Sequence, residues 1–232
     1  MRSNNFIVAH GHFRLSQTLM HIDNLIWIVI EDSATESSHI RRLLKRSRLP
    51  FCYMAVERDR SLPVRGWTAR EFALRLLKER FRNFGDRAVV YFADDDNSYD
   101  VRLFDGYIRN VETVGVWAVG LAGKSAVEAQ QVDLNGNVVG WLTQYAPKRT
   151  WAIDMAGFAI NLKLILSNNA TFRNCRHSSP EPCLLSTLNI RMSDLQPFGH
   201  LNEPRDILVW HTKTLVEINK PNAKTYGYVV ES

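Results

Sequence analysis

The residues best suited to chemistry in this chain are three consecutive carboxylates, Asp94, Asp95 and Asp96, followed by Asn97. They come directly after residues 89–93, an apolar and aromatic run typical of a buried strand. Adjacent like charges repel one another unless a cation relieves the repulsion. The carboxyl ends of strands in an open α/β sheet commonly bind ligands, and a divalent cation shared with a phosphate would fit there. A solvated acidic turn is the alternative for this triplet taken alone.

Two further strand ends carry side chains suited to a nucleotide. Asp32 follows the apolar run 25–30, which is typical of a strand buried on both faces. His211 follows a second apolar run, 207–210, and Lys213 lies two residues further on. A lone histidine after a strand is most often a packing or surface residue. A histidine with a lysine close by is suited to binding a diphosphate.

A pair of arginines brackets a predicted helix start. Thr68 and Glu71 have the spacing of a capping box, which predicts that a helix begins at Thr68. Arg65 and Arg70 then flank the N-terminus of that helix, where backbone N–H groups favour anions. Two solvated arginines are the alternative interpretation.

Two more acids precede or begin predicted helices in the second half of the chain. Asp154 comes before the strongly apolar segment 155–160, which predicts a helix that Asp154 caps. Glu181 lies between Pro180 and Pro182 and is suited to the first turn of a helix, where the dipole favours an acid. From the local sequence alone, these are the expected roles of both acids.

Strands and helices alternate in the first half of the chain, which predicts an α/β fold. The expected helices are 14–21, 37–46, one that begins at residue 68, and 100–110. The expected strands are 25–30, 51–56, 89–93, 114–121 and 207–210. Asn135-Gly136 predicts a β-hairpin. This change of pattern suggests a nucleotide-binding lobe, residues 1–97, joined to an acceptor-binding lobe, residues 98–232.

The composition is that of an ordinary globular protein, with 45% hydrophobic and 23% charged residues. The net charge of +5 is modest, and the basic residues are spread along predicted helices, so nucleic acid is not an expected partner. Cys175 and Cys183 could pair in an oxidising compartment, and two buried thiols are an equal alternative. No stretch approaches the roughly 20 apolar residues that span a membrane.

Several short motifs, each present once, follow one another along nearly the whole chain. The main segments are 91–97 (YFADDDN), 152–159 (AIDMAGFA) and 208–212 (LVWHT). Supporting segments are 27–32 (WIVIED), 138–141 (VVGW), and Arg65-Gly66 with Arg70. Together, from about residue 14 to about residue 211, they resemble the β-1,3-glucuronyltransferases of glycosyltransferase family 43.

The resemblance implies a GT-A type fold with a mixed, mostly parallel sheet flanked by helices. It also implies an inverting enzyme that uses Mn²⁺ and transfers glucuronic acid from UDP-glucuronic acid to the 3-position of a terminal galactose. Asp94 is expected to contact the glucuronic acid, Asp95 the ribose and Asp96 the Mn²⁺. The other donor-binding positions that the resemblance implies are Asp32, Arg65, Arg70, His211 and Lys213.

On the acceptor side, the resemblance implies that Glu181 is the catalytic base, although its proline neighbours differ from the residues usual in the family. As such a base, Glu181 would take a proton from the acceptor hydroxyl. Tyr145 stands where the family has an aromatic or hydrophobic platform for the acceptor sugar. The other acceptor-binding positions implied are Glu128, Arg149 and Asp154. The family further implies a Golgi location, a type II membrane anchor and a possible homodimer.

The similarity ends near the N-terminus. Residues 1–13 show no counterpart of the family's first strand, whose Thr-Pro-Thr-Tyr end stacks a tyrosine on uracil, or of its anchor. We therefore expect an N-terminally truncated or divergent member, in which a central strand is absent or residues 6–9 substitute for it. Two alternatives to an active transferase are an impaired paralogue that binds a sugar or a partner, and a metal-dependent phosphohydrolase.

Overall fold

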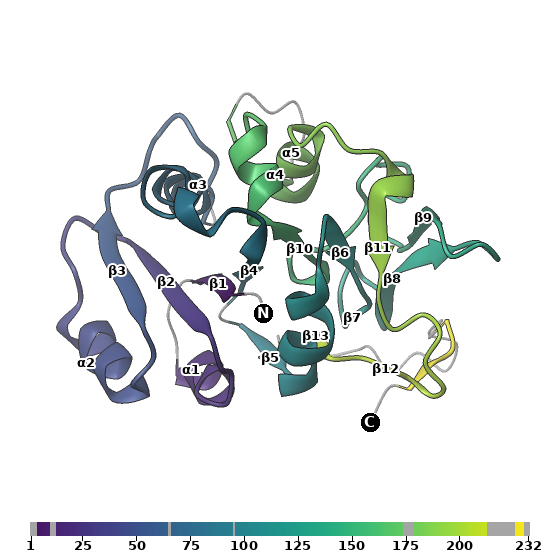
Figure 1. Ribbon diagram of the computed structural model, residues 1–232, viewed down its shortest axis with the longest axis horizontal. Coiled ribbons are helices and arrows are strands. Elements are labelled where there is room, and N and C mark those ends of the chain that lie inside the picture. The colour runs from purple at the N-terminus through teal and green to yellow at the C-terminus, as the bar shows by residue number, and fades with distance from the viewer. Residues whose placement is uncertain are drawn as a thin grey trace.

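The structure is a computed structural model that describes residues 4–9, 13–64, 66–94, 96–173, 179–212 and 226–229 (Figure 1). Its large sheet has the strand order β11-β6-β10-β4-β1-β2-β3. The bounds of these strands are β1 (Asn4–Ala9), β2 (Leu25–Asp32), β3 (Phe51–Val56), β4 (Ala88–Ala93), β6 (Val114–Val116), β10 (Phe158–Asn161) and β11 (Leu195–Pro197).

A smaller sheet has the order β5-β13-β7-β8-β9. Its strands are β5 (Asn97–Tyr99), β7 (Val119–Gly120), β8 (Val127–Val132), β9 (Val138–Leu142) and β13 (Val209–His211), and β12 (Arg205–Asp206) pairs separately with β14 (Tyr228–Val229). The helices are α1 (Phe13–Leu19), α2 (Ser38–Ser47), α3 (Trp67–Arg80), α4 (Leu162–Ser167) and α5 (Pro180–Ser186). No helix among the described residues is long and apolar enough to cross a membrane.

Strand β1 lies at the centre of the large sheet, in parallel register with β2 on one side and β4 on the other. Phe6 and Ile7 are fully buried, as expected for a parallel strand covered on both faces. Residues 6–9 therefore belong to a central strand, and the alternative that a central strand is absent is wrong.

The parallel arrangement of β3, β2, β1 and β4 brings their carboxyl ends to one edge of the sheet. Ala9 pairs with both Val29 and Ala93, so the C-terminal parts of β1, β2 and β4 lie side by side. The acids that end β2 and that follow β4 thus lie at the carboxyl ends of the strands, where open α/β sheets bind ligands.

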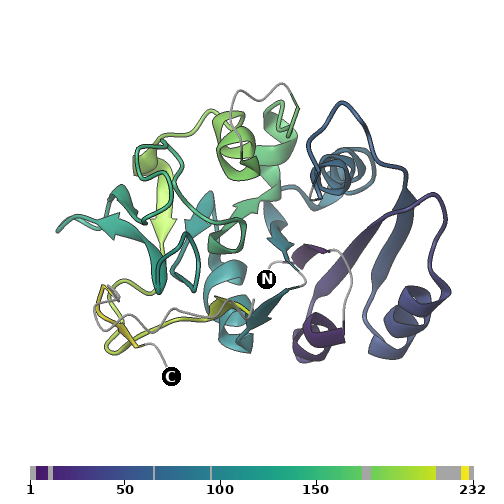
Figure 2. The ribbon, with the colours of Figure 1, turned by 180° about the vertical axis from the view of Figure 1, so that it is seen from behind.

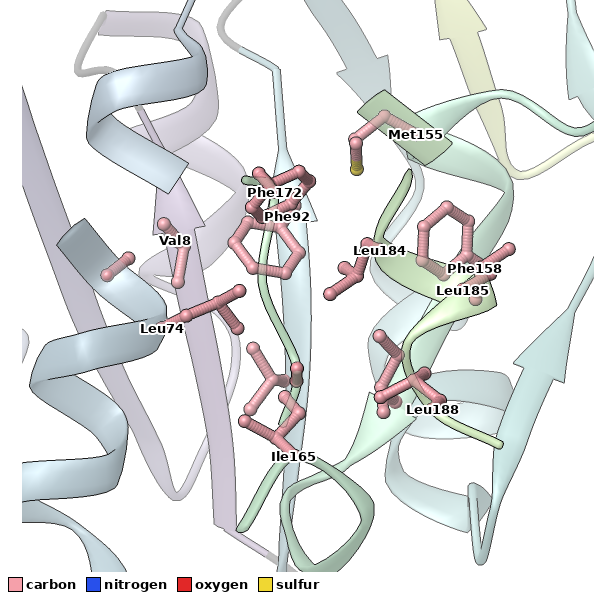
Figure 3. Packing of buried hydrophobic residues seen from close by; sticks show 14 of the residues in the cluster. Val8, Leu74, Phe92, Met155, Phe158, Ile165, Phe172, Leu184, Leu185 and Leu188 are labelled. Atoms are coloured by element: carbon pink, nitrogen blue, oxygen red, sulfur yellow. The ribbon is translucent and has the colours of Figure 1, made fainter. Parts of the chain in front are cut away.

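Helices cover both faces of this sheet. Helices α1 and α2 lie on one side, and α3, α4 and α5 lie on the other (Figures 1 and 2). The side-chain alternation of the strands supplies both cores, since Phe6 and Phe92 face α3 and α5 whereas Ile7 and Tyr91 face the opposite way. Figure 3 shows Phe92 and Val8 of the sheet packed near Leu74 of α3 and Leu184 of α5.

Some predicted elements are confirmed and others are wrong. The strand at 51–56 and the hairpin at Asn135-Gly136 are confirmed, with Gly136 at a φ of +83°. The expected strand 114–121 divides between the two sheets as β6 and β7. Trp117 interrupts it because its backbone N–H donates to Gly157 O at 3.0 Å and its indole donates to Ala156 O at 2.8 Å.

The helix predicted after Asp154 is also wrong. Asp154 caps only a short 3₁₀ turn, Met155–Gly157, and the chain then continues as β10. This strand gains ladder hydrogen bonds from both β4 and β6, and an apolar run this short cannot distinguish strand from helix. The helix begins later, at α4, where Asn161 accepts a hydrogen bond from the Lys163 N–H.

The helix predicted at residues 100–110 is present but irregular, with a π turn at Leu103–Tyr107 and a 3₁₀ turn at Ile108–Asn110. The predicted capping box is wrong, because α3 begins at Trp67 after Gly66 at a φ of +79°. The Thr68 hydroxyl instead accepts from the Asp59 N–H at 3.1 Å. Among the cysteines, Cys52 has a free thiol, Cys183 is disulfide-bonded, and Cys175 lies outside the described residues.

Candidate functional site

The end of β4 carries a partly buried ion pair. Asp94 follows the strand directly, and its carboxylate contacts the guanidinium of Arg70 from the N-terminal part of α3. Tyr99 donates its hydroxyl to the Asp94 backbone carbonyl at 2.6 Å, which fixes the turn after the strand. Burial raises the pKa of the Asp94 carboxyl, and Arg70 opposes that shift. The pair therefore places the Asp94 carboxyl, in contact with a guanidinium, at the end of the sheet where ligands are expected.

His211 reaches the same place from the smaller sheet. The antiparallel pairing of β5 and β13 sets His211 opposite Asn97, and the Thr212 N–H donates to the Asp96 carbonyl at 3.0 Å. His211 Nε2 lies 3.1 Å from Asp154 Oδ1. The ring nitrogen is not aligned as a hydrogen bond requires, so the two side chains form an ion pair.

The charge of His211 depends on the acids around it. Burial lowers the pKa of the imidazole, but the Asp154 carboxylate, with smaller contributions from Asp94 and Asp96, raises it to about 8. Asp154 also accepts a hydrogen bond from the Ala156 N–H at 2.9 Å, so the residue that caps the 3₁₀ turn also holds the histidine. His211 is therefore cationic at neutral pH.

Replacing Asp154 by asparagine is expected to move the pKa of His211 from about 8 down towards its ordinary value of 6.5. The amide can still cap the turn, but it removes the negative charge that stabilises the imidazolium. Titration of the ring protons by NMR measures the shift. Asp133→Asn, in the exposed hairpin loop, is the control, and a pKa that stays near 8 in Asp154→Asn would contradict the assignment.

Glu181 lies in the first turn of α5 and is buried, with 9% of its surface exposed. Its Oε2 atom has no hydrogen-bond partner among the described residues. Burial, and then the nearby charge of Asp154, raises the pKa of the Glu181 carboxyl to about 8, against the opposing effects of Arg70 and Arg149. Such a carboxyl is poised to exchange a proton near neutral pH.

A second buried acid, Glu128 on β8, accepts a hydrogen bond from the Thr143 hydroxyl. Burial raises the pKa of the Glu128 carboxyl to about 7, which the Thr143 hydrogen bond opposes and the charge of Asp154 reinforces. Gly123, at a φ of +59°, passes so close that an added Cβ would lie 2.2 Å from Glu128 Oε2. A glycine is therefore required beside this acid.

Arg149 and Tyr145 form the exposed rim next to Glu181. The Arg149 guanidinium lies 4.9 Å from the centre of the Tyr145 ring, within the range of a cation–π contact. It also donates to Ser179 Oγ at 2.9 Å, just ahead of α5. Tyr145 is 43% exposed, and Lys124 Nζ also lies 6.0 Å from the centre of its ring.

At the carboxyl end of β2, Glu31 makes hydrogen bonds that the sequence did not indicate. Asp32 is exposed, whereas its neighbour Glu31 accepts hydrogen bonds from the Tyr53 hydroxyl and the Ser37 N–H. Burial and then the Glu31 hydrogen bond raise the pKa of Tyr53 to about 12. Glu31 therefore braces the end of the strand and leaves Asp32 available to a ligand.

Asp154 lies where the two groups of predicted residues meet. It contacts His211 on one side, and its charge raises the pKa of Glu181 and of Glu128 on the other. The donor-side and acceptor-side positions thus share one electrostatic environment. The predicted positions Arg65, Asp95 and Lys213 lie outside the described residues.

Comparison with solved structures defines the class of fold. The structure of S. aureus TarS, residues 1–349, aligns over 90% of this chain and 60% of its own with a TM-score of 0.59, at 13% sequence identity. A second TarS structure, in complex with UDP, aligns with a TM-score of 0.50. The chain has a GT-A-type glycosyltransferase fold, as the mainly parallel sheet and its flanking helices predict.

Sequence comparison defines the family. The family model described as glycosyltransferase family 43 matches residues 15–215. Human galactosylgalactosylxylosylprotein 3-beta-glucuronosyltransferase 1 is 40% identical over 215 residues, which cover 87% of this chain and 63% of the relative. The Caenorhabditis elegans relative sqv-8, whose name gives the same activity, is 36% identical over 213 residues. The alignment covers 87% of this chain and 59% of that relative. The chain belongs to glycosyltransferase family 43, and it spans less than two thirds of the length of these relatives.

Proposed function

We propose that this protein transfers glucuronic acid from UDP-glucuronic acid to the 3-position of a terminal galactose on a glycan or proteoglycan linker, with inversion at the anomeric carbon. Family membership and the names of its relatives support the class of reaction. The observation that carries the proposal is the buried carboxyl of Glu181, with its unpaired oxygen and a pKa of about 8, in one electrostatic environment with Asp154 and Arg70.

The donor is proposed to bind along the carboxyl edge of β2, β1 and β4. Asp94, held by Arg70, would accept hydrogen bonds from sugar hydroxyl groups. Protonated His211 would contact the diphosphate, and Asp32 would contact the uracil. Arg65, Asp95 and Lys213 are proposed to bind the donor from the family resemblance alone. That TarS, a protein of similar fold, has been solved in complex with UDP supports a nucleotide-sugar donor.

The residues here fit a manganese ion completed by the donor. The described residues contain no group of three or more side chains able to hold a metal, so a cage made of protein alone is not the expected arrangement. The acids beside His211 are hard oxygen donors, and such cations are often held by one or two carboxylates plus substrate phosphates. We propose that Asp96 holds Mn²⁺. A bound ion would stabilise negative charge on the departing diphosphate.

The chain's own groups account for the proton and for the orientation of the acceptor. Ionised Glu181 takes the proton from the attacking hydroxyl, and the charge of His211 favours departure of the UDP. Arg149, Asp154 and Glu128 bind and orient the acceptor sugars, while Tyr145 offers an aromatic face. A single displacement with one carboxylate base inverts the anomeric centre and needs no covalent nucleophile.

The setting of this reaction is also proposed. From the family resemblance, we propose a Golgi lumenal location for the protein. A homodimer is proposed from the family resemblance, and light scattering of the purified chain measures it. The impaired-paralogue alternative was motivated by a missing first strand, and the presence of β1 removes that motivation.

The test is UDP release from UDP-glucuronic acid by the purified protein with Mn²⁺ and a galactose-terminated acceptor. We expect release that depends on the acceptor and a product with a β-linked glucuronic acid at the 3-position. Folded protein that releases no UDP would reject the proposal. Acceptor-independent hydrolysis that persists in Glu181→Ala would instead favour the phosphohydrolase.

A further inference from the structure

We infer that Glu71 is a positioning residue, which clamps the segment 171–173 against α3 and thereby fixes α5, with Glu181, relative to the Arg70–Asp94 pair. The inference rests on the proposed role of Glu181 as the base. The contacts that carry it come from residues far apart in the sequence, on α3, on the segment before α5, and on the loop before α3.

Glu71 lies on the inward face of α3. Trp67, Glu71, Leu74 and Lys78 are spaced by four, three and four residues, so they share one face of the helix. Trp67 and Leu74 are 4% and 1% exposed, so this face packs against the rest of the protein. A carboxylate in such a stripe needs partners to offset its loss of water.

Among the described residues, the hydrogen-bond and ion-pair partners of Glu71 come from the segment 171–173. Its carboxylate accepts the Thr171 hydroxyl at 2.9 Å and the Phe172 N–H at 2.7 Å. The Arg173 Nε lies 3.5 Å from it. At the other end of the stripe, Lys78 Nζ donates to the Ala170 carbonyl at 2.6 Å. Helix α3 therefore holds this segment through Glu71 and Lys78, and both make charge-assisted hydrogen bonds to it.

Arg173 ties the same segment to the loop that precedes α3. Its guanidinium contacts Asp59 Oδ2 at 2.6 Å, and the Asp59 N–H in turn donates to the Thr68 hydroxyl in the first turn of the helix. The two residues predicted to form a capping box, Thr68 and Glu71, thus both serve tertiary contacts. The clamp joins three separate parts of the chain.

The clamped segment contacts α5 and β4 directly. The Thr171 N–H donates to the hydroxyl of Thr187, the residue that caps α5. Phe172 is fully buried, with its ring 5.6 Å from that of Phe92 and 6.3 Å from that of Trp67. Figure 3 shows Phe172 beside Phe92, with Leu184 of α5 nearby.

Phe92 lies two residues before Asp94, and Leu184 lies three residues after Glu181. Displacing Phe172 would therefore shift the helix that carries the base against the strand that presents the donor-side acid. Transfer is sensitive to such a shift, since a misplacement of about 1 Å between reacting groups can lower the rate about 100-fold.

The experiment compares Glu71→Ala, Glu71→Gln and the control Glu79→Ala, an exposed acid on the same helix. The measurements are kcat for UDP release with acceptor, UDP affinity by calorimetry, and amide hydrogen exchange over residues 179–187. We expect Glu71→Ala to lower kcat by about 10- to 100-fold and to speed exchange in α5, with UDP affinity within about twofold of the unaltered protein. Glu71→Gln should retain more activity, because its amide oxygen still accepts the Phe172 N–H.

An unchanged kcat in Glu71→Ala would overturn the inference, as would unchanged exchange over residues 179–187. A fall in UDP affinity that matches the fall in kcat would also overturn it, because the loss would then lie on the donor side. If the unaltered protein shows no transfer, the proposed function fails, and the exchange measurement still decides whether Glu71 fixes α5.

Discussion

Glu181→Gln is expected to lower kcat for sugar transfer by about 10²- to 10⁴-fold, the usual contribution of a general base. The amide has nearly the same shape as the carboxyl but cannot take a proton. Because the pKa of Glu181 is about 8, the buried side chain is mostly neutral at pH 7 in the unliganded protein, and a neutral amide should leave thermal stability unchanged or slightly raised. Loss of activity without loss of stability therefore identifies the base.

The matched control for this substitution is Glu79→Gln, an exposed acid on α3, which should retain full activity. The pH profile adds a second readout. kcat/KM should rise with pH as Glu181 loses its proton near pH 8 and fall as His211 loses its own near the same pH, which gives a narrow maximum close to 8. Glu181→Gln should lose the rising limb. A variant with kcat within about fivefold of the unaltered protein would show that another group is the base.

Phe6→Ala is expected to destabilise the fold by about 3–5 kcal/mol, the usual cost of removing a buried phenylalanine. Phe6 is fully buried in β1. Its ring packs edge to face against two others, with ring centres 4.7 Å apart for Phe81 and 5.2 Å apart for Phe84. Because β1 pairs with both β2 and β4, a loss here weakens the part of the sheet that presents the acids.

Urea unfolding measures this effect, and Val139→Ala is the control. Val139 is 52% exposed on β9, so its truncation should change stability by no more than about 0.5 kcal/mol. If Phe6→Ala is as stable as Val139→Ala, the N-terminal segment does not fill the centre of the sheet. The assignment of β1 as a central strand of the large sheet would then be wrong.

Most strands of the large sheet could be predicted because they are buried on both faces, where continuous apolar runs are unambiguous. Residues 25–30 and 89–93 are examples, whereas 51–56, at the edge of the sheet, is mostly half-buried. Strand β1 could be predicted only as an alternative, since residues 6–9 form a short apolar run. Its assignment depends on pairing with β2 and β4, which local sequence does not specify. The segment 158–161 was misassigned for the same reason, because two neighbouring strands decide its conformation.

The sequence predicted individual residues of the candidate site but not the contacts between them. Local sequence predicted that Asp154 caps a helix, whereas it caps a short 3₁₀ turn, and nothing local indicated its ion pair with His211. The bond of Glu31 to Tyr53 and that of Glu128 to Thr143 were missed as well, because each joins two different strands or loops. Glu71 was assigned to a cap by its spacing, whereas tertiary partners from 171–173 outcompete the local bond.

The most direct test of the account is calorimetric titration of UDP into the protein with and without Mn²⁺, in three forms: unaltered, Asp96→Ala and Glu181→Gln. The central claim is that the acids after β4 hold a metal–nucleotide complex while Glu181 acts from the other side of the site. It predicts Mn²⁺-dependent UDP binding that Asp96→Ala abolishes and Glu181→Gln preserves. UDP binding that ignores both Mn²⁺ and Asp96, or that is lost in Glu181→Gln, would contradict it.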